Sequence, residues 1–194
     1  MKILNQSIFL LAGLSLVLFG CGEDDKVIGL NSAAKYGSIT ITMEGTRLDG
    51  KAFKATKEFK FMPEEGPDNS SVFFDGAASS FYIQRQHGAV GNSHNDNLAQ
   101  VYFYTSSDVP TQANISFYTS ILASDDVYFY IYDAITIGPE NITGYSYNED
   151  TGKLKFSFKG TVPAISSSTD HDLSIKGTVS VTVFENVGED GGGI

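Results

Sequence analysis

Two histidines and an aspartate in one irregular stretch are the residues of this sequence best suited to metal chemistry. His87, His94 and Asp96 lie within residues 86–97, a segment rich in turn formers and without hydrophobic periodicity. Two imidazoles and a carboxylate are ligands that zinc accepts. Their spacing matches no established zinc signature, and a polar surface loop explains the same residues. We therefore expect no metal ion and no cofactor.

The other reactive residue types form no catalytic pattern. Gly91-Asn92-Ser93-His94 lacks the second glycine of a nucleophile elbow, and no strand-to-helix turn surrounds it. Acidic neighbours occur at 64–65, 125–126 and 149–150. Neighbours in sequence do not make a glycosidase pair, which needs two carboxylates facing one bond from different elements. The sequence predicts no catalytic residue, and we expect a protein that is not an enzyme.

Tyrosines supply the best candidate for a binding surface. In the segment 127–132, Val-Tyr-Phe-Tyr-Ile-Tyr, apolar residues alternate with tyrosines, which places the tyrosines on one face of a strand. A tyrosine row gives a large contact area at low entropic cost and suits a glycan or an extended peptide. The alternative is that these phenols cover the core or decorate a solvated face. The candidate ligand-binding residues are Tyr128, Tyr130 and Tyr132, joined by Tyr102 and Tyr104.

The elements that must position these residues are β-strands. The chain contains 14 Phe, 10 Tyr and 20 Gly, and no segment has the periodicity of an amphipathic helix. Strict alternation over 38–44, and again over 173–183, is typical of half-buried strands. About ten short strands with frequent turn signals predict an all-β fold, a single antiparallel β-sandwich. The alternative is a β-barrel.

Four local features carry specific expectations. Asp49-Gly50 predicts a hairpin turn, and Lys57 interrupts the apolar row of the strand that follows, which indicates a bulge or an edge. Residues 142–147 and 153–160 predict a second hairpin, with Gly152 in the left-handed conformation. In its second arm, Leu154, Phe156 and Phe158 should face the core while Lys153, Lys155 and Lys159 face outward. Residues 165–170 read as a serine-rich loop.

The N-terminus has the build of an export signal. Lys2 precedes an apolar run over 8–19 that is short for a bilayer span and is followed at once by acids. The run ends in Leu18-Phe19-Gly20-Cys21, which resembles the lipobox of bacterial lipoproteins. The resemblance implies cleavage before Cys21 and lipidation of this cysteine, the only one in the chain. Several acyl chains would hold the protein stably on a membrane.

Three acids directly after the lipobox refine the expected location. Glu23, Asp24 and Asp25 resemble the acidic export signal of bacteroidete-type surface lipoproteins. This resemblance implies an outer-membrane protein displayed on the cell surface; the alternative is a spacer on a protein that faces the periplasm. Without residues 1–20 the chain has 174 residues, 12 basic and 23 acidic, a net charge of −11. Such a charge disfavours nucleic acid as a partner.

These observations divide the chain into a signal peptide (1–20), a lipidated acidic tether (21–35), one β-sandwich domain (36–187) and a flexible tail (188–194). We expect a lipid-anchored envelope protein that works as a non-enzymatic binding module for a glycan, a peptide or an envelope protein. The alternative is an accessory or structural subunit that docks on an outer-membrane complex, and a hydrolase is a distant third. A binding module predicts exposed, contiguous tyrosines. An accessory subunit predicts an exposed apolar patch or a bare strand edge.

Overall fold

The all-β prediction is confirmed. The structure is a computed structural model that describes residues 36–61, 70–86, 98–122, 127–131 and 133–185; the side chains of 119–122 and 127–130 are outside this description. The described elements are twelve strands and two short 3-10 turns, η3 (Pro139–Asn141) and η4 (Ala164–Ser166). The strands are β1 (Gly37–Thr46), β2 (Ala52–Lys60), β3 (Ser70–Asp75), β4 (Ala78–Gln86), β5 (Leu98–Ser106), β6 (Val109–Leu122), β7 (Val127–Tyr130), β8 (Ile135–Ile137), β9 (Ile142–Asn148), β10 (Lys153–Val162), β11 (Leu173–Thr182) and β12 (Phe184–Glu185).

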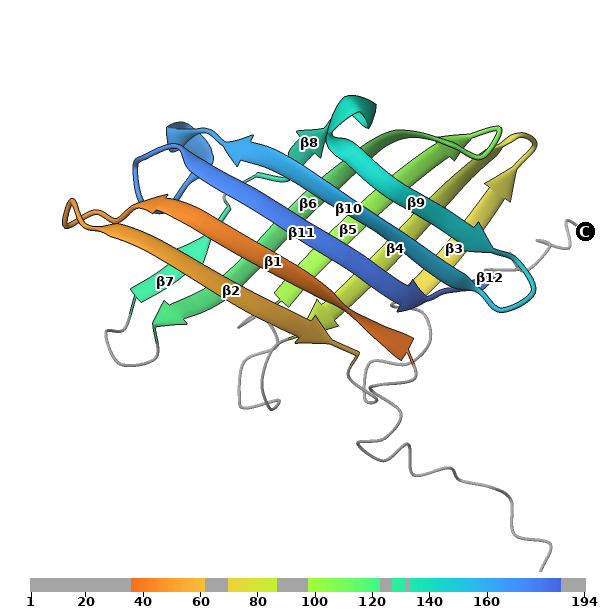
Figure 1. Ribbon diagram of the computed structural model, residues 1–194, viewed down its shortest axis with the longest axis horizontal. Helices are drawn as coiled ribbons and strands as arrows, with labels where there is room; N and C mark the ends of the chain where they lie inside the picture. The colour runs from red at the N-terminus through yellow and green to blue at the C-terminus, as the bar shows by residue number, and fades with distance from the viewer. Residues whose placement is uncertain (1–35, 62–69, 87–97, 123–126, 132, 186–194) are drawn as a thin grey trace, which may run out of the picture.

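The strands form one sheet that folds over itself into two layers. Its order is β7-β6-β5-β4-β2-β1-β11-β10-β9, with β3 on β4 and β8 on β6. One layer holds β2, β1, β11, β10 and β9, and the other, behind it in Figure 1, holds β3 to β8. A single residue pair, Lys60 with Gln86, joins the layers where β2 meets β4. The fold therefore has features of both predicted architectures: two packed layers, as in a β-sandwich, formed by one nearly closed sheet, as in a β-barrel.

The sheet is antiparallel apart from one short pair. β12 runs parallel to β3, with Phe184 opposite Ser71 and Glu185 opposite Val72. Parallel pairing needs a long connection, and here residues 76–183 lie between the two strands. Alternation along a single segment carries no information about such a distant partner, so the sequence predicts an antiparallel sheet and misses this contact.

Aromatic side chains fill the space between the layers. Phe103 of β5 stacks on Phe156 of β10, with ring centroids 4.2 Å apart and planes at 15°. Phe81 of β4 lies 5.7 Å from Phe103 and 5.1 Å from Tyr147 of β9. Phe81, Phe103 and Phe156 are fully buried. These contacts bind one layer to the other, and burial of apolar area on this scale is the main stabilising term of such a fold.

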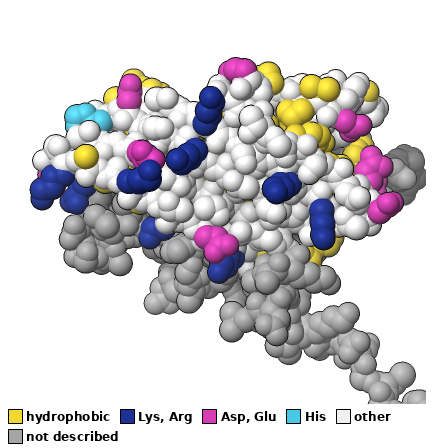
Figure 2. All heavy atoms as spheres, viewed as in Figure 1, with side chains coloured by type: hydrophobic (Ala, Val, Ile, Leu, Met, Phe, Trp, Pro, Cys, Tyr) yellow, Lys and Arg dark blue, Asp and Glu magenta, His cyan; other side chains and the backbone are white. Residues whose placement is uncertain are grey.

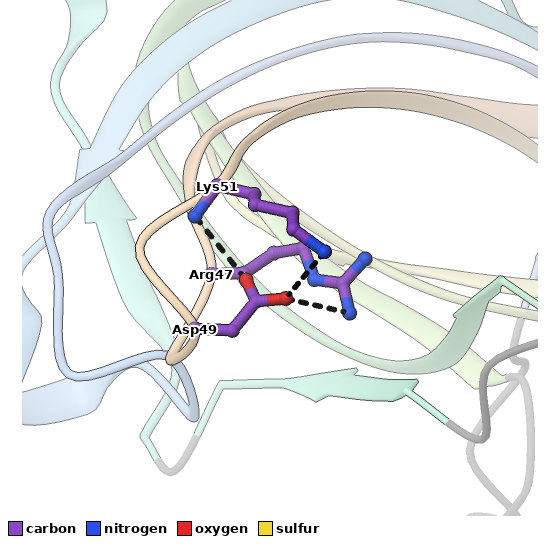
Figure 3. A network of polar contacts seen from close by, with 3 residues as sticks. All are labelled: Arg47, Asp49 and Lys51. Atoms are coloured by element: carbon purple, nitrogen blue, oxygen red, sulfur yellow. Dashed lines mark hydrogen bonds and ion pairs between the residues drawn. The ribbon is translucent and has the colours of Figure 1, made fainter.

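The hairpin turn predicted at Asp49-Gly50 is confirmed. Gly50 has φ +77°, and backbone bonds join Gly50 N–H to Arg47 O and Arg47 N–H to Lys51 O. Figure 3 shows the Asp49 carboxylate accepting the Lys51 backbone N–H at 3.2 Å and pairing with the Arg47 guanidinium at 3.4 Å and the Lys51 ammonium at 3.5 Å. The hydrogen bond from the Lys51 backbone, together with the two cations, lowers the pKa of Asp49.

Lys57 lies on an edge strand without a bulge. The β1–β2 register is regular from Ser38↔Lys60 to Thr46↔Ala52. Beyond the pair formed by Lys60, β2 has no second neighbour among the described strands. Lys57 is half-buried on the same face as Phe59. The edge alternative is therefore confirmed, and a lysine there fits the protection that exposed edges need.

The hairpin of β9 and β10 is also confirmed. Gly152 has φ +64°, and Thr151 donates to the Asn148 side chain from both its backbone N–H and its hydroxyl. Leu154, Phe156 and Phe158 are buried, while the lysines of β10 are exposed, as predicted. The predicted loop at 165–170 is more ordered than expected: it begins in η4, and Ser167 and Thr169 are buried and hydrogen-bonded to each other at 2.8 Å.

A buried arginine holds the start of β1 against β4. Arg85 is fully buried and donates to the carbonyl oxygens of Tyr36 (2.9 Å), Gly37 (3.2 Å) and Gln84 (2.6 Å) and to the Ser70 hydroxyl (2.6 Å). Buried charge is costly unless hydrogen-bonded, and the rigid guanidinium fork meets that demand with several carbonyl groups at once. Arg85 thus connects the first described residues of the domain to β3 and β4.

Candidate functional site

The outward face of β4, β5 and β6 is the best candidate for a binding surface. The antiparallel register places Tyr82 opposite Tyr102, and Tyr102 opposite Asn114. The same register pairs Gln84 with Gln100 and Ser80 with Tyr104. We call this surface the polar aromatic face. It consists of Ser80, Tyr82, Gln84, Gln100, Tyr102, Tyr104, Gln112, Asn114, Ser116 and Tyr118, none of which carries a charge.

Hydrogen bonds and ring contacts fix the centre of this face. The rings of Tyr82 and Tyr102 lie 4.9 Å apart, tilted by 39°. The Tyr82 hydroxyl donates to Gln84 Oε1 at 2.7 Å, and Gln100 Nε2 donates to the same oxygen at 2.8 Å. Tyr102 remains 45% exposed. The centre therefore offers an open aromatic surface beside amides that are already oriented, a low-entropy arrangement for binding.

A shallow groove borders the polar aromatic face. It has a volume of about 500 Å³ and runs over β3 to β6. Phe73, 54% exposed, and Tyr104 contribute rings, and Ser80 and Gln112 contribute polar groups. Ligand sites of this size combine apolar surface with a few polar groups that orient the ligand. The groove can hold a short segment of a polymer. Asp75 is the one carboxylate among the described residues that line it, and no described histidine, lysine or cysteine accompanies this acid.

A second groove, of about 590 Å³, lies where the two layers fail to close. Phe74 and Tyr147 form its aromatic wall, with rings 6.3 Å apart, and Glu149 and Glu185 add two carboxylates. Burial, followed by the charges of Glu149 and Glu185, raises the pKa of Tyr147 above its ordinary value. The tyrosine thus stays a neutral phenol to a higher pH than usual. The groove can bind a ligand, and none of the described residues that line it is a histidine that could act as a base.

The structure places only part of the predicted tyrosine set. Tyr102 and Tyr104 lie on the polar aromatic face, as predicted. The backbones of Tyr128 and Tyr130 belong to β7, where Tyr130 pairs with Tyr118 and Tyr128 with Ser120, but their side chains are not described. Tyr132 lies outside the described residues.

Sequence reasoning missed Tyr82, Gln84 and Gln100 as members of the site. Alternation in Phe81-Tyr82-Ile83-Gln84 was the available signal, because it places Tyr82 and Gln84 on one face. That this face adjoins Tyr102 depends on the register of β4 against β5, which no single strand specifies.

The metal-ligand candidates His87, His94 and Asp96 lie outside the described residues, as do Cys21, Glu23, Asp24 and Asp25. Within the described ranges, no three His, Cys, Asp or Glu side chains come close enough to hold a metal ion. In the same part of the chain, no helix combines the length and apolar character that crossing a membrane requires.

Comparison with known proteins gives no relative from which to argue. No family model matches the chain, and no curated protein sequence or solved structure is significantly similar to it.

Proposed function

We propose that this protein is a lipid-anchored, exported envelope protein whose β domain is a non-enzymatic binding module, with the polar aromatic face as its ligand surface. The observation that carries the proposal is the exposed Tyr102 ring beside Tyr82 and the oriented Gln84–Gln100 amides, on a face without charge. Rings, amides and hydroxyls are the groups that bind neutral sugars and extended peptides.

The length of the strands under this face favours an extended ligand. Strands β4 and β5 are each nine residues long, so an extended chain of roughly 30 Å could lie along them at about 3.4 Å per residue. The Tyr102 ring and the Gln84–Gln100 amide pair, two residues further along the strands, would contact such a ligand at two points, which increases affinity without a deep pocket.

Binding to an array of neutral oligosaccharides and extended peptides tests the ligand proposal. Replacing Tyr102 with alanine should weaken binding of any hit by about tenfold or more, as expected for an aromatic residue at the centre of an interface. Ile165→Ala is the matched control, because it also removes an exposed apolar side chain, 88% exposed, from η4, which contributes no residue to the polar aromatic face. If both variants bind as the parent does, the polar aromatic face is not the ligand surface.

The location is tested separately from the ligand. Cys21→Ala should release the protein into the soluble fraction of cells, because the lipid is the proposed attachment. Protease treatment of intact cells should digest the domain if it is displayed outside. A Cys21→Ala variant that stays with the membrane would contradict the anchor, and survival of the domain on intact cells would contradict surface display.

A second candidate function is an accessory subunit that docks on an outer-membrane complex. Two observations favour it. Phe74 of β3 is 37% exposed and its ring lies 6.3 Å from that of Tyr147 on β9, whereas Phe73, 54% exposed, points to the opposite face of β3. In addition, β9 ends the strand order and has β10 as its only described sheet neighbour. A partner could add a strand to this edge and cover Phe74. Under this function, Phe74→Asp should abolish co-purification of the partner while Tyr102→Ala leaves it intact.

A further inference from the structure

The outward face of the other layer carries an unexpected positive charge. On β1, β2, β10 and β11 the outward residues include six lysines and two glutamates, a net charge of +4. The whole chain has a net charge of −10, so the remainder carries −14. Figure 2 views this face and shows Lys and Arg side chains spread across it. Positive charge is thus concentrated on one surface of an acidic protein.

The two glutamates do not compensate the lysines of β10. Glu44 pairs with Lys54 at 2.6 Å and more distantly with Lys176 at 3.8 Å. Glu58 pairs with Lys60 at 3.2 Å. The described residues give Lys153, Lys155 and Lys159 no ion pair, although Glu149 and Asp150 lie in the turn just before β10. These three lysines, with Lys176, form what we call the lysine patch.

The geometry of the lysine patch is linear. Lys153, Lys155 and Lys159 lie along the outward face of β10, so their row is about 20 Å long at roughly 3.4 Å per residue. Lys176 lies directly opposite Lys159 on β11. Like charges at directly opposite positions destabilise an antiparallel pair. Glu44 pairs with Lys176 at 3.8 Å, but no ion pair within the described residues joins Lys159 to a carboxylate. A bound anion would relieve the repulsion that remains.

From this geometry we infer that the lysine patch binds a linear anionic polysaccharide, one that carries carboxylate, sulfate or phosphate groups. The lysines provide charge complementarity at intervals along an extended row. Hydroxyl groups lie between them, with Ser157 and Thr178 in contact at 3.3 Å and Ser180 opposite Lys155. Hydroxyls and ammonium groups together match the hydroxyl and acid groups of such a polymer.

A polysaccharide fits this face better than an anionic bilayer does. The exposed large apolar side chains of the described domain are Leu48, Phe73, Phe74, Tyr102, Val109 and Ile165. None of them belongs to the outward rows of β1, β2, β10 or β11. Interfacial membrane binding combines basic residues with inserted apolar ones, and this face supplies only the first. The patch also lies on the opposite layer from the polar aromatic face, so the inference is independent of the proposed ligand surface.

The test measures binding of the full-length chain, purified in a neutral detergent, to dextran sulfate, with uncharged dextran as the ligand control. The parent should bind dextran sulfate alone. Lys155→Gln and Lys159→Gln should each weaken binding about fivefold, the effect of one lysine near an anionic surface. Each should also reduce the slope of log affinity against log salt by about one. Lys51→Gln, a 75% exposed lysine in the β1–β2 turn, is the matched control and should leave both values unchanged.

Each other outcome overturns the inference. Equal loss in the Lys51→Gln control would mean that overall charge, and not the patch, determines binding. If Lys155→Gln and Lys159→Gln both bind dextran sulfate as the parent does, the lysine patch is not the binding site. Vesicles provide the last comparison, because a lipid anchor inserts into neutral and anionic bilayers alike. Stronger attachment to vesicles with 30% phosphatidylglycerol than to neutral vesicles, lost in Lys155→Gln, would identify an anionic membrane as the occupant instead.

Discussion

Replacing Phe156 with alanine tests whether the two layers really pack on each other. Phe156 on β10 is fully buried and stacks on Phe103 of β5 at 4.2 Å, so it joins the two layers directly. An aromatic side chain buries roughly 150–250 Å², which at about 25 cal/mol per Å² corresponds to at most about 4–6 kcal/mol. Alanine retains part of that burial, and we expect a loss of about 3–5 kcal/mol in the free energy of unfolding.

Urea unfolding followed by circular dichroism measures this loss, because the chain has no tryptophan for fluorescence. Phe156→Leu is the control for side-chain shape and should cost less than the alanine variant. A double-mutant cycle with Phe103→Ala should give a coupling of about 0.5–1.5 kcal/mol, the value typical of stacked aromatic pairs. A loss below about 1 kcal/mol together with zero coupling would refute the packed-layer arrangement and indicate a wide, solvated interior.

Three further predictions concern glycine geometry and pH. Gly152→Ala should lower the free energy of unfolding by about 1–3 kcal/mol or more, because φ is +64° and a Cβ would collide with the Val183 carbonyl oxygen. Gly50→Ala is the control: Gly50 also has a positive φ but lies in open space, so this change should cost about 1 kcal/mol. Equal melting temperatures of the two variants would contradict this prediction. The hydrogen bond and charge of Lys54 lower the pKa of Glu44 from 4.5. The ionised Glu44 side chain therefore stabilises the fold above pH 4.5, and this stabilisation should be lost as the pH falls through the lowered pKa. In Glu44→Gln, the free energy of unfolding should depend less on pH in the acid range. Burial and nearby carboxylates raise the pKa of Tyr147 above 10.0. The neutral phenol therefore stabilises the fold below pH 10, and this stabilisation should be lost as the pH rises through the raised pKa of the folded state. Tyr147→Phe should remove this loss of stability at alkaline pH, measured by unfolding and by tyrosinate absorbance across a pH titration.

Local features of the fold could be predicted because they depend on neighbours in sequence. Alternation identifies buried and exposed faces without reference to a partner strand. For this reason the prediction that the phenylalanines of β10 face the core is confirmed. The turns at Gly50 and Gly152 require positive φ, a demand that glycine meets without steric cost. The short parallel pair of β12 with β3 joins strands more than a hundred residues apart, so no local sequence pattern predicts it.

The candidate site was predictable only in part for the same reason. Tyr102 and Tyr104 could be placed on one strand face, whereas Tyr82 and Gln84 join them only through the β4–β5 register. Net charge gave an incomplete picture as well. The negative total predicts repulsion from anionic partners, yet it averages over surfaces and conceals a face of net charge +4.

The sequence by itself determined the strand content, the tight turns and the outward lysines of β10, because side-chain alternation and glycine conformation are local properties. It also carries the signal-like N-terminus and Cys21, whose role stays a prediction. Tertiary structure decided which strands pair, and with that three features of the molecule. It stacked Phe103 on Phe156, brought Tyr82 beside Tyr102, and set Lys176 opposite Lys159. These contacts arise from long-range pairing, whose register is chosen by the packing of the whole core and by no single segment.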